Sequence, residues 1–242
     1  MAAPKIILYT SHLCPWAHRA HIALKELGLE YEEVIIDLDR PRDPWYLEIN
    51  PRGLVPTISY NGTIIPESAI VTQLLADAHP SHLVPPSNTV EGALQRAHIS
   101  FFVDTFFSKV WTHAVASHRA TSASERSAAA TALVEAIEKN NVESLLYPEG
   151  EGSSGSGPFF RGAEKLTLAE ALTGSFLLRL LSLHKPEYGL LAPELPRLLE
   201  ERAPRFLKWA QAVVEQDSVN FIWDEKVVGT RTAKKFKGVA KV

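Results

Sequence analysis

The spacing of apolar residues along the chain changes near residue 80. Before that point, short apolar runs alternate with helical patterns, and after it the apolar residues recur at helical spacing almost throughout. Short apolar runs between turn residues are typical of buried strands, and helical spacing is typical of amphipathic helices. The chain therefore predicts an α/β domain at 1–80, a linker at 81–91 and an all-α domain at 92–242.

The first domain opens with a strand, a helix and a second strand. The runs at 5–9 (KIILY) and 31–38 (YEEVIIDL) predict the two strands. Between them, apolar or small residues at 17–27 keep a helical spacing up to Gly28, a residue that can end a helix. A βαβ unit of this kind has parallel strands and a right-handed crossover.

A β-hairpin and a further helix complete this domain. The runs at 55–60 and 63–65 flank an Asn-Gly pair, which tolerates the positive φ angles of a tight turn. Apolar residues on one face of 67–78 predict the closing helix. With an acidic and aromatic turn at 43–49 in between, the predicted order is βαβαββα.

The rest of the chain predicts packed helices. The proline-rich stretch 79–88 predicts an extended connector, because proline is excluded from helix interiors and from central strands. The segments 92–120 and 124–146 predict two long helices. Apolar spacing at 168–183 predicts the central core helix, and 204–215 predicts one more amphipathic helix.

Three shorter signals accompany these helices. The Gly/Ser-rich segment 149–157 predicts a mobile loop. Thr167 and Glu170 have the spacing of a capping box, in which each side chain bonds the backbone near the other. The segment after Trp223 is rich in lysine and arginine and predicts a solvated tail (Lys226, Arg231, Lys234, Lys235 and Lys237).

Composition excludes several classes of protein. A chain of 242 residues, 45% of them hydrophobic, can fill real cores. The formal net charge of -3 gives no positive field that would attract nucleic acid or an anionic membrane. No apolar stretch approaches the roughly 20 residues that span a bilayer, and the N-terminus lacks an apolar leader. We therefore expect a cytoplasmic protein with no nucleic-acid partner, no membrane partner and no metal.

Cys14 is the only cysteine, so the chain cannot form an internal disulfide. It directly follows the first predicted strand, and Pro15 after it suits the first position of a helix. At a helix N-terminus, free backbone N–H groups and the helix dipole stabilise a thiolate, which can attack disulfides. Free cysteines are more often buried apolar residues. The position after the first strand favours a reactive thiol.

Two further pairs of residues could contribute to a site. Pro56 starts a strand, and Val55-Pro56 is either a cis bond that presents backbone groups to Cys14 or an ordinary strand start. Glu67-Ser68 begins a helix, whose N–H groups can receive a carboxylate while the Glu67 carboxylate pairs with an ammonium group. An ordinary helix cap is the alternative for this pair. The spacing leaves both questions open.

Taken together, these motifs resemble the soluble glutathione transferase family over essentially the whole chain. The resemblance is carried by ILYTSHLCPWAHR, NPRGLVPTI, ESAI and TLAEA. It implies a thioredoxin-like βαβαββα domain followed by a helical bundle. Cysteine in place of tyrosine or serine is similar to the cysteine-dependent, omega-like class of fungal type, and the CPWA motif also resembles glutathionyl-hydroquinone reductases.

The resemblance implies that glutathione is the cosubstrate and assigns its contacts. A cis Val55-Pro56 bond is expected to hold the cysteinyl part through the backbone, and the Glu-Ser pair is expected to hold the γ-glutamyl end. Arg42 is expected to bind the glycyl carboxylate, with Arg40 as the alternative. The residues expected to contact glutathione are thus Trp16, Arg42, Val55, Pro56, Glu67 and Ser68.

A substrate is expected beside Cys14, in the cleft between the two domains. Aromatic residues of the helical domain are candidates for its lining, although aromatic residues at helical spacing more often belong to a core. These weaker candidates are Trp111 and Trp223, followed by Phe102 and Phe106.

The resemblance implies a glutathione-dependent thiol transferase or reductase that acts on glutathionylated or oxidised small molecules. Thioltransferase, dehydroascorbate reductase and deglutathionylating activities are the expected forms, and the single Cys14 requires a monothiol mechanism. One alternative is a conjugating transferase for an electrophile, for which Tyr9 and Ser11 are weaker candidate groups. The other is a non-catalytic binding module, because a fold alone never fixes function. A homodimer is expected in either case.

Overall fold

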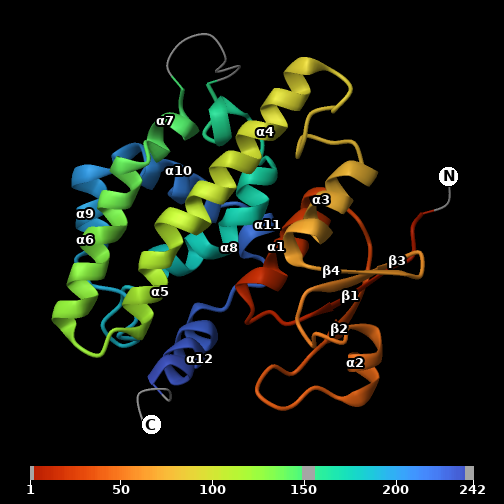
Figure 1. Cartoon of the computed structure of the whole chain (residues 1–242), viewed down its shortest axis with the longest axis horizontal. Coiled ribbons are helices and arrows are strands. Elements are labelled where there is room, and N and C mark those ends of the chain that lie inside the picture. The colour runs from red at the N-terminus through yellow and green to blue at the C-terminus, as the bar shows by residue number, and fades with distance from the viewer. Residues whose placement is uncertain (1–2, 149–155, 238–242) are drawn as a thin grey trace.

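The computed structural model describes residues 3–148 and 156–237. Its N-terminal part is a four-stranded sheet with helices, and the rest is helical (Figure 1). The predicted order βαβαββα is confirmed, and the segment expected as a turn at 43–49 contains the short helix α2. The elements are β1 (Ile6–Thr10), α1 (Pro15–Glu26), β2 (Glu32–Ile35), α2 (Pro44–Ile49), β3 (Thr57–Tyr60), β4 (Thr63–Pro66) and α3 (Ser68–Ala78).

The sheet has the strand order β2-β1-β3-β4, with β1 and β2 parallel and the other neighbours antiparallel. Successive side chains of β1 point to opposite faces of the sheet. Leu8 belongs to the main core together with residues of α1 and α3, whereas Tyr9 packs against Tyr46 of α2 with ring centroids 5.7 Å apart. The chain therefore leaves β1 towards Cys14 from the centre of a sheet that is packed on both faces.

The helical part begins after the connector. Its elements are α4 (Val90–Thr105), the π-helical turn η1 (Phe106–Val110), α5 (Trp111–Arg119), α6 (Ala123–Lys139), α7 (Val142–Leu146), the 3-10 turn η2 (Phe160–Gly162), α8 (Leu168–Ser182), α9 (Leu195–Arg202), α10 (Pro204–Val214), α11 (Asp217–Asn220) and α12 (Glu225–Lys237). The two long helices expected at 92–120 and 124–146 are each interrupted. The turn η1 separates α4 from α5, and Asn141, with a left-handed φ of 51°, separates α6 from α7. Apolar spacing alone does not register such local breaks.

The helix α8 is the central core helix that the sequence predicts, and its N-terminus has the predicted capping box. Glu170 is fully buried and accepts hydrogen bonds from the backbone N–H of Thr167 at 2.8 Å and of Phe160 at 2.7 Å. It also accepts one from Nε1 of Trp209 at 2.8 Å. Burial raises the pKa of the Glu170 carboxyl. One carboxylate thus joins η2, α8 and α10.

The sheet domain and the helical part share one continuous hydrophobic core. Three side chains also link the segment around α1 to α8 through backbone carbonyls. Ser175 Oγ donates to Pro15 O at 2.7 Å, Arg179 Nη2 to Leu13 O at 3.1 Å, and Arg19 Nε to Leu172 O at 2.8 Å. The boundaries that the sequence suggests for two domains and a linker stay a prediction.

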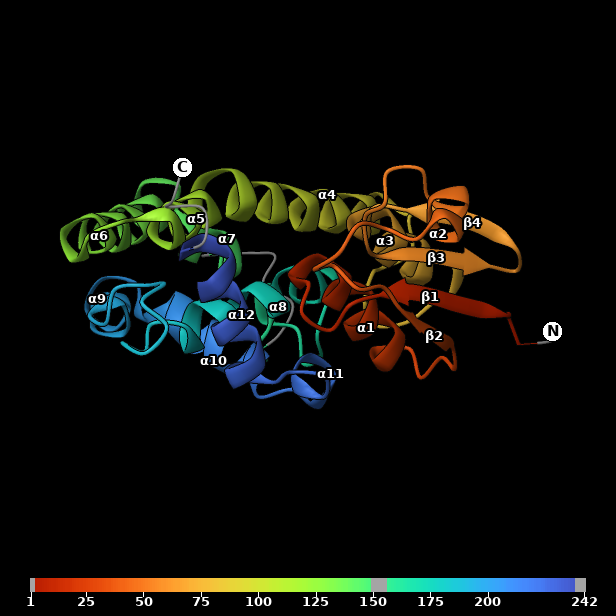
Figure 2. The same cartoon turned by 90° about the horizontal axis from the view of Figure 1, so that it is seen from below.

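The segment after Trp223 is not the solvated tail that we expected. It forms α12, which buries Val228 and Ala233, packs against α5 and lies across the helical part (Figure 2). Arg231 of α12 contacts Asp39 in the loop between β2 and α2. The expectation was wrong because α12 has few large apolar residues, so that its basic composition dominates the pattern.

Two further sequence expectations concern mobility and membranes. Residues 149–155 of the predicted Gly/Ser loop lie outside the described residues. Within the described part of the chain, no helix combines the length and the apolar character needed to cross a bilayer.

Candidate functional site

A cavity of about 710 Å³ lies between the start of α1, the loop after β2, the start of α3 and one face of α12. Its lining includes all the residues that the sequence assigns to the thiol and to glutathione. These are Cys14, Trp16, Arg42, Val55, Pro56, Glu67 and Ser68. The fold thus brings together residues from four separate segments of the chain.

Cys14 is the N-cap residue of α1, with extended backbone angles and Pro15 at the first helical position. Its side chain is partly buried, and Sγ lies 3.9 Å from the carbonyl oxygen of Val55, to which the thiol can donate. The N–H groups of the first helical turn have no partner within the helix, and they stabilise negative charge at this position. The Cys14 sulfur therefore lies at the positive end of the α1 dipole.

The loop that faces Cys14 is held by buried polar side chains that the sequence interpretation missed. The Val55-Pro56 bond is cis, as the family resemblance implies. Tyr46 donates its hydroxyl to the carbonyl of Leu54 at 2.6 Å, and Asn50 donates its amide to the same carbonyl at 3.0 Å. These bonds fix the backbone next to Val55. Asn50 in the NPRG segment is the signal that could have indicated this support.

Glu67 and Ser68 lie at the N-terminus of α3. Glu67 has a left-handed φ of 73°, and its carboxylate forms an ion pair with Arg52. Ser68 is buried, and its hydroxyl accepts a hydrogen bond from Nη1 of Arg19 at 3.0 Å. The Ser68 hydroxyl proton and the first N–H groups of α3 remain as donors for an anion.

Two buried arginines lie close to Cys14, and the sequence interpretation named neither of them. Burial lowers the pKa of Arg19 to about 9 and that of Arg179 to about 10, and in both cases the charge of Cys14 opposes this shift. Both side chains therefore stay cationic at neutral pH. Arg19 is further packed between the rings of Trp16 and Phe107, at 4.5 and 4.4 Å from their centroids. An arginine on the apolar face of α1 is the signal that could have revealed this role.

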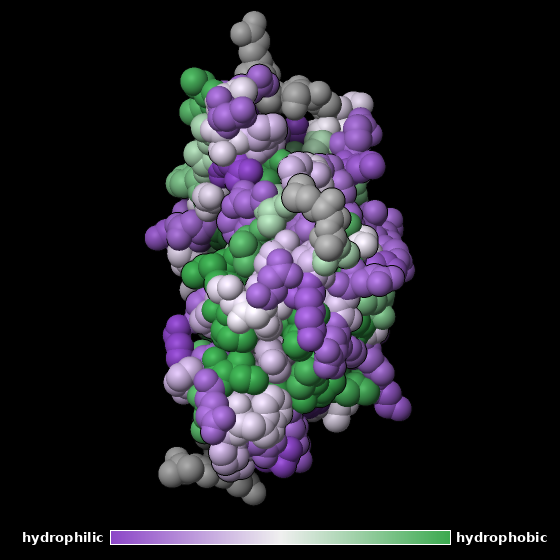
Figure 3. Space-filling view, turned by 90° about the vertical axis from the view of Figure 1, so that its right-hand side faces the viewer, coloured by the Kyte–Doolittle hydropathy of each residue, from purple (hydrophilic) through white to green (hydrophobic). Residues whose placement is uncertain are grey.

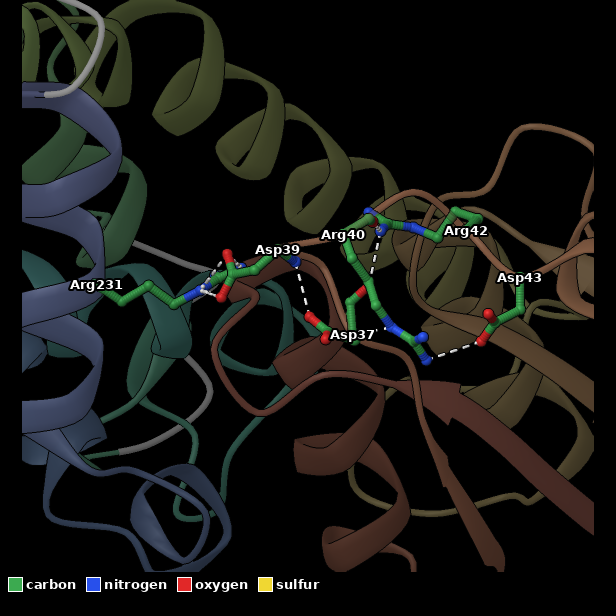
Figure 4. Close-up of polar contacts among 6 residues, drawn as sticks. All are labelled: Asp37, Asp39, Arg40, Arg42, Asp43 and Arg231. Carbon is green, nitrogen blue, oxygen red and sulfur yellow. Dashed lines mark hydrogen bonds and ion pairs between the residues drawn. The ribbon is translucent and has the colours of Figure 1, made fainter.

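Arg42 lines the cavity and braces the loop between β2 and α2. Its Nε donates to Gly53 O at 2.9 Å, and its Nη1 donates to the carbonyls of Asp37 and Arg40 at 2.7 Å each. Arg40 lies outside the cavity lining and pairs with Asp43 at 3.0 Å. Figure 4 shows the contacts among the residues of this loop together with the pair of Asp39 and Arg231. Of the two arginines considered for the glycyl carboxylate, Arg42 is the one at the cavity.

The aromatic candidates for a substrate pocket lie outside this cavity lining. Trp111 packs against Phe176 with centroids 4.9 Å apart, and the Trp223 ring lies 5.0 Å from the guanidinium of Arg179. Phe102 and Phe106 are core residues. The assignment of Trp111 and Trp223 to a substrate pocket stays a prediction.

One group of side chains has the composition of a metal site. His12, His21 and Glu33 bring their ligand atoms within 4.8 Å of one another. The atoms also bond within the protein: Nε2 of His12 lies 2.6 Å from Glu33, and the two ring nitrogens of His21 lie 2.9 Å from Thr10 and Tyr31. Hydrogen bonds within the protein therefore link these three side chains to one another and to Thr10 and Tyr31.

Residues 13–78 match the family model described as "Glutathione S-transferase, N-terminal domain". Among curated proteins, the chain is similar to glutathione S-transferase omega-1 of Rattus norvegicus, with 33% identity over 99 residues, or 40% of this chain and 41% of that protein. It is also similar to the probable cytosolic glutathione S-transferase DHAR1 of Oryza sativa subsp. japonica, with 34% identity over 83 residues, or 33% and 38% of the two chains. The similarity thus spans about two fifths of these relatives.

Solved structures extend the likeness to nearly the whole chain. Glutathione transferase Omega 2C from Trametes versicolor has a TM-score of 0.77 and 28% identity over 96% of this chain and 99% of its own. Omega 1C from the same organism has a TM-score of 0.77 and 27% identity over 96% and 97%. The predicted fold class, a thioredoxin-like domain followed by a helical part, is therefore confirmed.

Proposed function

Because this chain belongs to the glutathione transferase family as an omega-like member, we propose that it is a glutathione-dependent thiol transferase that reduces glutathionylated or oxidised small molecules. The observation that carries the proposal is the position of Cys14, at the N-cap of α1 in the cavity, with the cationic Arg19 and Arg179 as buried neighbours. Positive charges and free N–H groups stabilise a thiolate, which is the attacking form of a cysteine.

Glutathione fits this cavity in an extended conformation. Its γ-glutamyl carboxylate would accept hydrogen bonds from the Ser68 hydroxyl and the first N–H groups of α3, and its ammonium group would pair with Glu67. Its cysteinyl part would lie along the backbone of Val55, opposite Cys14. Its glycyl end would then extend towards the loop that contains Arg42.

The reaction proceeds in two exchanges, each of which breaks one S–S bond and forms another. The Cys14 thiolate attacks the glutathione sulfur of a mixed disulfide, and the acceptor leaves as a thiolate that takes a proton from water. A second glutathione, as its thiolate, attacks the glutathione sulfur of the Cys14 mixed disulfide. The products are glutathione disulfide and the regenerated Cys14 thiolate, and no second cysteine is needed.

Paired kinetics of the wild type and Cys14→Ser test this proposal, with a glutathione mixed disulfide and a chlorinated aryl electrophile as the two substrates. Thiol transfer should fall to background in the variant, while glutathione affinity by titration calorimetry stays close to that of the wild type. Conjugation that persists in the variant, without any thiol transfer that depends on Cys14, would identify a conjugating transferase instead. Glutathione binding with neither activity would identify a binding module.

We also propose that the protein is a cytoplasmic homodimer. Large apolar side chains are exposed on α3 and α4, with 57% exposure for Ile70 and for Phe101 and 56% for Leu94. Apolar patches also lie among the polar side chains on the face drawn in Figure 3. Closed two-fold pairs are the commonest oligomers. Light scattering should give twice the 26.8 kDa of one chain, and a monomer mass would refute the assignment.

A further inference from the structure

The helix α12 brings cations to the end of the cavity that is formed by the loop after β2. The loop 37–43 follows β2, at one edge of the sheet, whereas Glu67 and Ser68 follow β4, at the opposite edge. Arg231 and Lys235 line the cavity together with this loop. Because they are four residues apart in α12, they lie on the same face of the helix.

Arg231 is held in place by Asp39, as Figure 4 shows. Its Nε and Nη2 donate to the two carboxylate oxygens, with a shortest distance of 2.7 Å. Among the described residues, the N–H groups on Nη1 have no hydrogen-bond partner. Asp39 therefore fixes the guanidinium, which keeps donors for a second anion. In this role Asp39 is a positioning residue.

Positive charge exceeds negative charge at this end of the cavity. Its lining residues there include Arg42, Arg231 and Lys235 but only one carboxylate, Asp39. The hydrogen bond from Arg231 and the charges of Arg231, Lys234 and Lys235 lower the pKa of Asp39, so that it is ionised at neutral pH. One carboxylate cannot neutralise three cations. Lys235 is exposed, and within the described part of the chain it forms no ion pair.

We propose that Arg231 and Lys235 of α12, with Asp39 as the positioning residue, form a carboxylate-binding subsite at this end of the cavity. The inference rests on the proposed function, because the carboxylate belongs to a disulfide bound beside Cys14. Two sources share this chemistry: the glycyl carboxylate of glutathione, and a carboxylate on the acceptor thiol. In both cases the bound ligand joins α12 to the sheet domain.

The experiment uses the full chain and compares kcat/KM for a matched series of substrates. One arm uses glutathione mixed disulfides of 3-mercaptopropionate, 2-mercaptoethanol and cysteamine, whose leaving thiols are anionic, neutral and cationic. The other arm replaces glutathione by γ-glutamylcysteine, which lacks the glycyl residue, as the reducing thiol. The variants are Arg231→Gln and Lys235→Gln. Lys226→Gln is the control, because Lys226 is an exposed lysine of the same helix outside the cavity lining.

If the acceptor supplies the carboxylate, the wild type should prefer the anionic disulfide over the cationic one by about three- to tenfold, as expected for partly exposed charge pairs. If glutathione supplies it, γ-glutamylcysteine should be less effective than glutathione by a similar factor. Either preference should shrink in Lys235→Gln and Arg231→Gln and persist in Lys226→Gln.

Absence of both preferences in the wild type would overturn the subsite, and so would preferences that the two variants leave unchanged. A uniform loss of activity for every substrate in Arg231→Gln would indicate a structural role for Arg231. In that case Lys235→Gln, which changes an exposed side chain, decides whether the subsite exists: a preference that shrinks in this variant supports the subsite, and an unchanged preference overturns it. In all these outcomes thiol transfer by the wild type remains, so that the proposed function stands. Its absence with every disulfide would instead refute the proposed function.

Discussion

Removal of the Glu170 carboxylate should destabilise the helical part by several kcal/mol. Glu170 is fully buried and accepts hydrogen bonds from the backbone N–H groups of Thr167 and Phe160, from the Thr167 hydroxyl and from Nε1 of Trp209. In Glu170→Ala these four donors lose their acceptor in an interior that water reaches poorly. Each buried donor left unpaired costs about 1 kcal/mol or more. Since the buried carboxylate itself costs desolvation, we expect a net loss of about 3 kcal/mol.

Equilibrium urea unfolding measures this loss, with the fluorescence of the buried Trp209 contributing to the signal. The urea concentration at the midpoint of unfolding should fall in the variant. The slope of the free energy of unfolding against urea concentration should stay constant, which indicates that unfolding exposes the same surface area in both proteins. Glu170→Asp is the matched control, because it keeps the carboxylate on a shorter side chain. It should lose only about 1 kcal/mol, as one or two of the bonds lengthen.

Two results would refute this reasoning. A loss below about 1 kcal/mol in Glu170→Ala would mean that water or a rearranged side chain satisfies the four donors. Equal losses in Glu170→Ala and Glu170→Asp would mean that packing volume, and not the carboxylate, is what matters at this position.

His118, Ser68 and Gly53 provide three further predictions. Burial lowers the pKa of His118 from 6.5 to about 4, so that the unfolded chain takes up this proton at a higher pH than the folded protein does. The contribution of His118 to the free energy of unfolding is therefore fully present above pH 6.5, and it falls by up to about 1.4 kcal/mol per pH unit between pH 6.5 and about 4. Urea unfolding over this range should give a shallower loss for His118→Gln, and equal slopes would contradict the assignment. Ser68→Ala should weaken glutathione binding about tenfold in titration calorimetry, because a carboxylate loses a hydroxyl donor; unchanged affinity would exclude Ser68 from the site. Gly53→Ala should lower the melting temperature, since φ is +62° and a Cβ would meet Arg42 Cγ at 3.0 Å; an unchanged melting temperature would show that the loop adapts.

Local signals account for the part of the site that the sequence predicts. Cys14 follows a strand and caps a helix, and Glu67-Ser68 begins a helix after a hairpin, so that neighbouring residues alone define both positions. The capping box at Thr167 and Glu170 is likewise a pattern of four consecutive residues. Such features depend on backbone geometry over one turn, which sequence spacing specifies well.

The missed features depend on residues that are distant in the chain. Arg179 bonds the carbonyl of Leu13, 166 positions earlier, and Arg231 bonds Asp39, 192 positions earlier. No local sequence pattern predicts such pairs, because any exposed acidic residue could form an ion pair with a basic helix equally well. The interruption at η1 was missed for a different reason: the apolar spacing continues while the hydrogen bonding changes.

The thiol site is therefore a property of both parts of the chain, although the sheet domain and the loops around it contain all the residues predicted for glutathione. Arg179 reaches from α8 to the loop before Cys14, and Ser175 bonds the carbonyl of Pro15 just after it. These bonds fix the backbone on both sides of the sulfur, and Arg179 adds a cation that water cannot screen well, since its side chain is buried. It follows that substitutions on α8 can alter the reactivity of Cys14 without touching a glutathione contact.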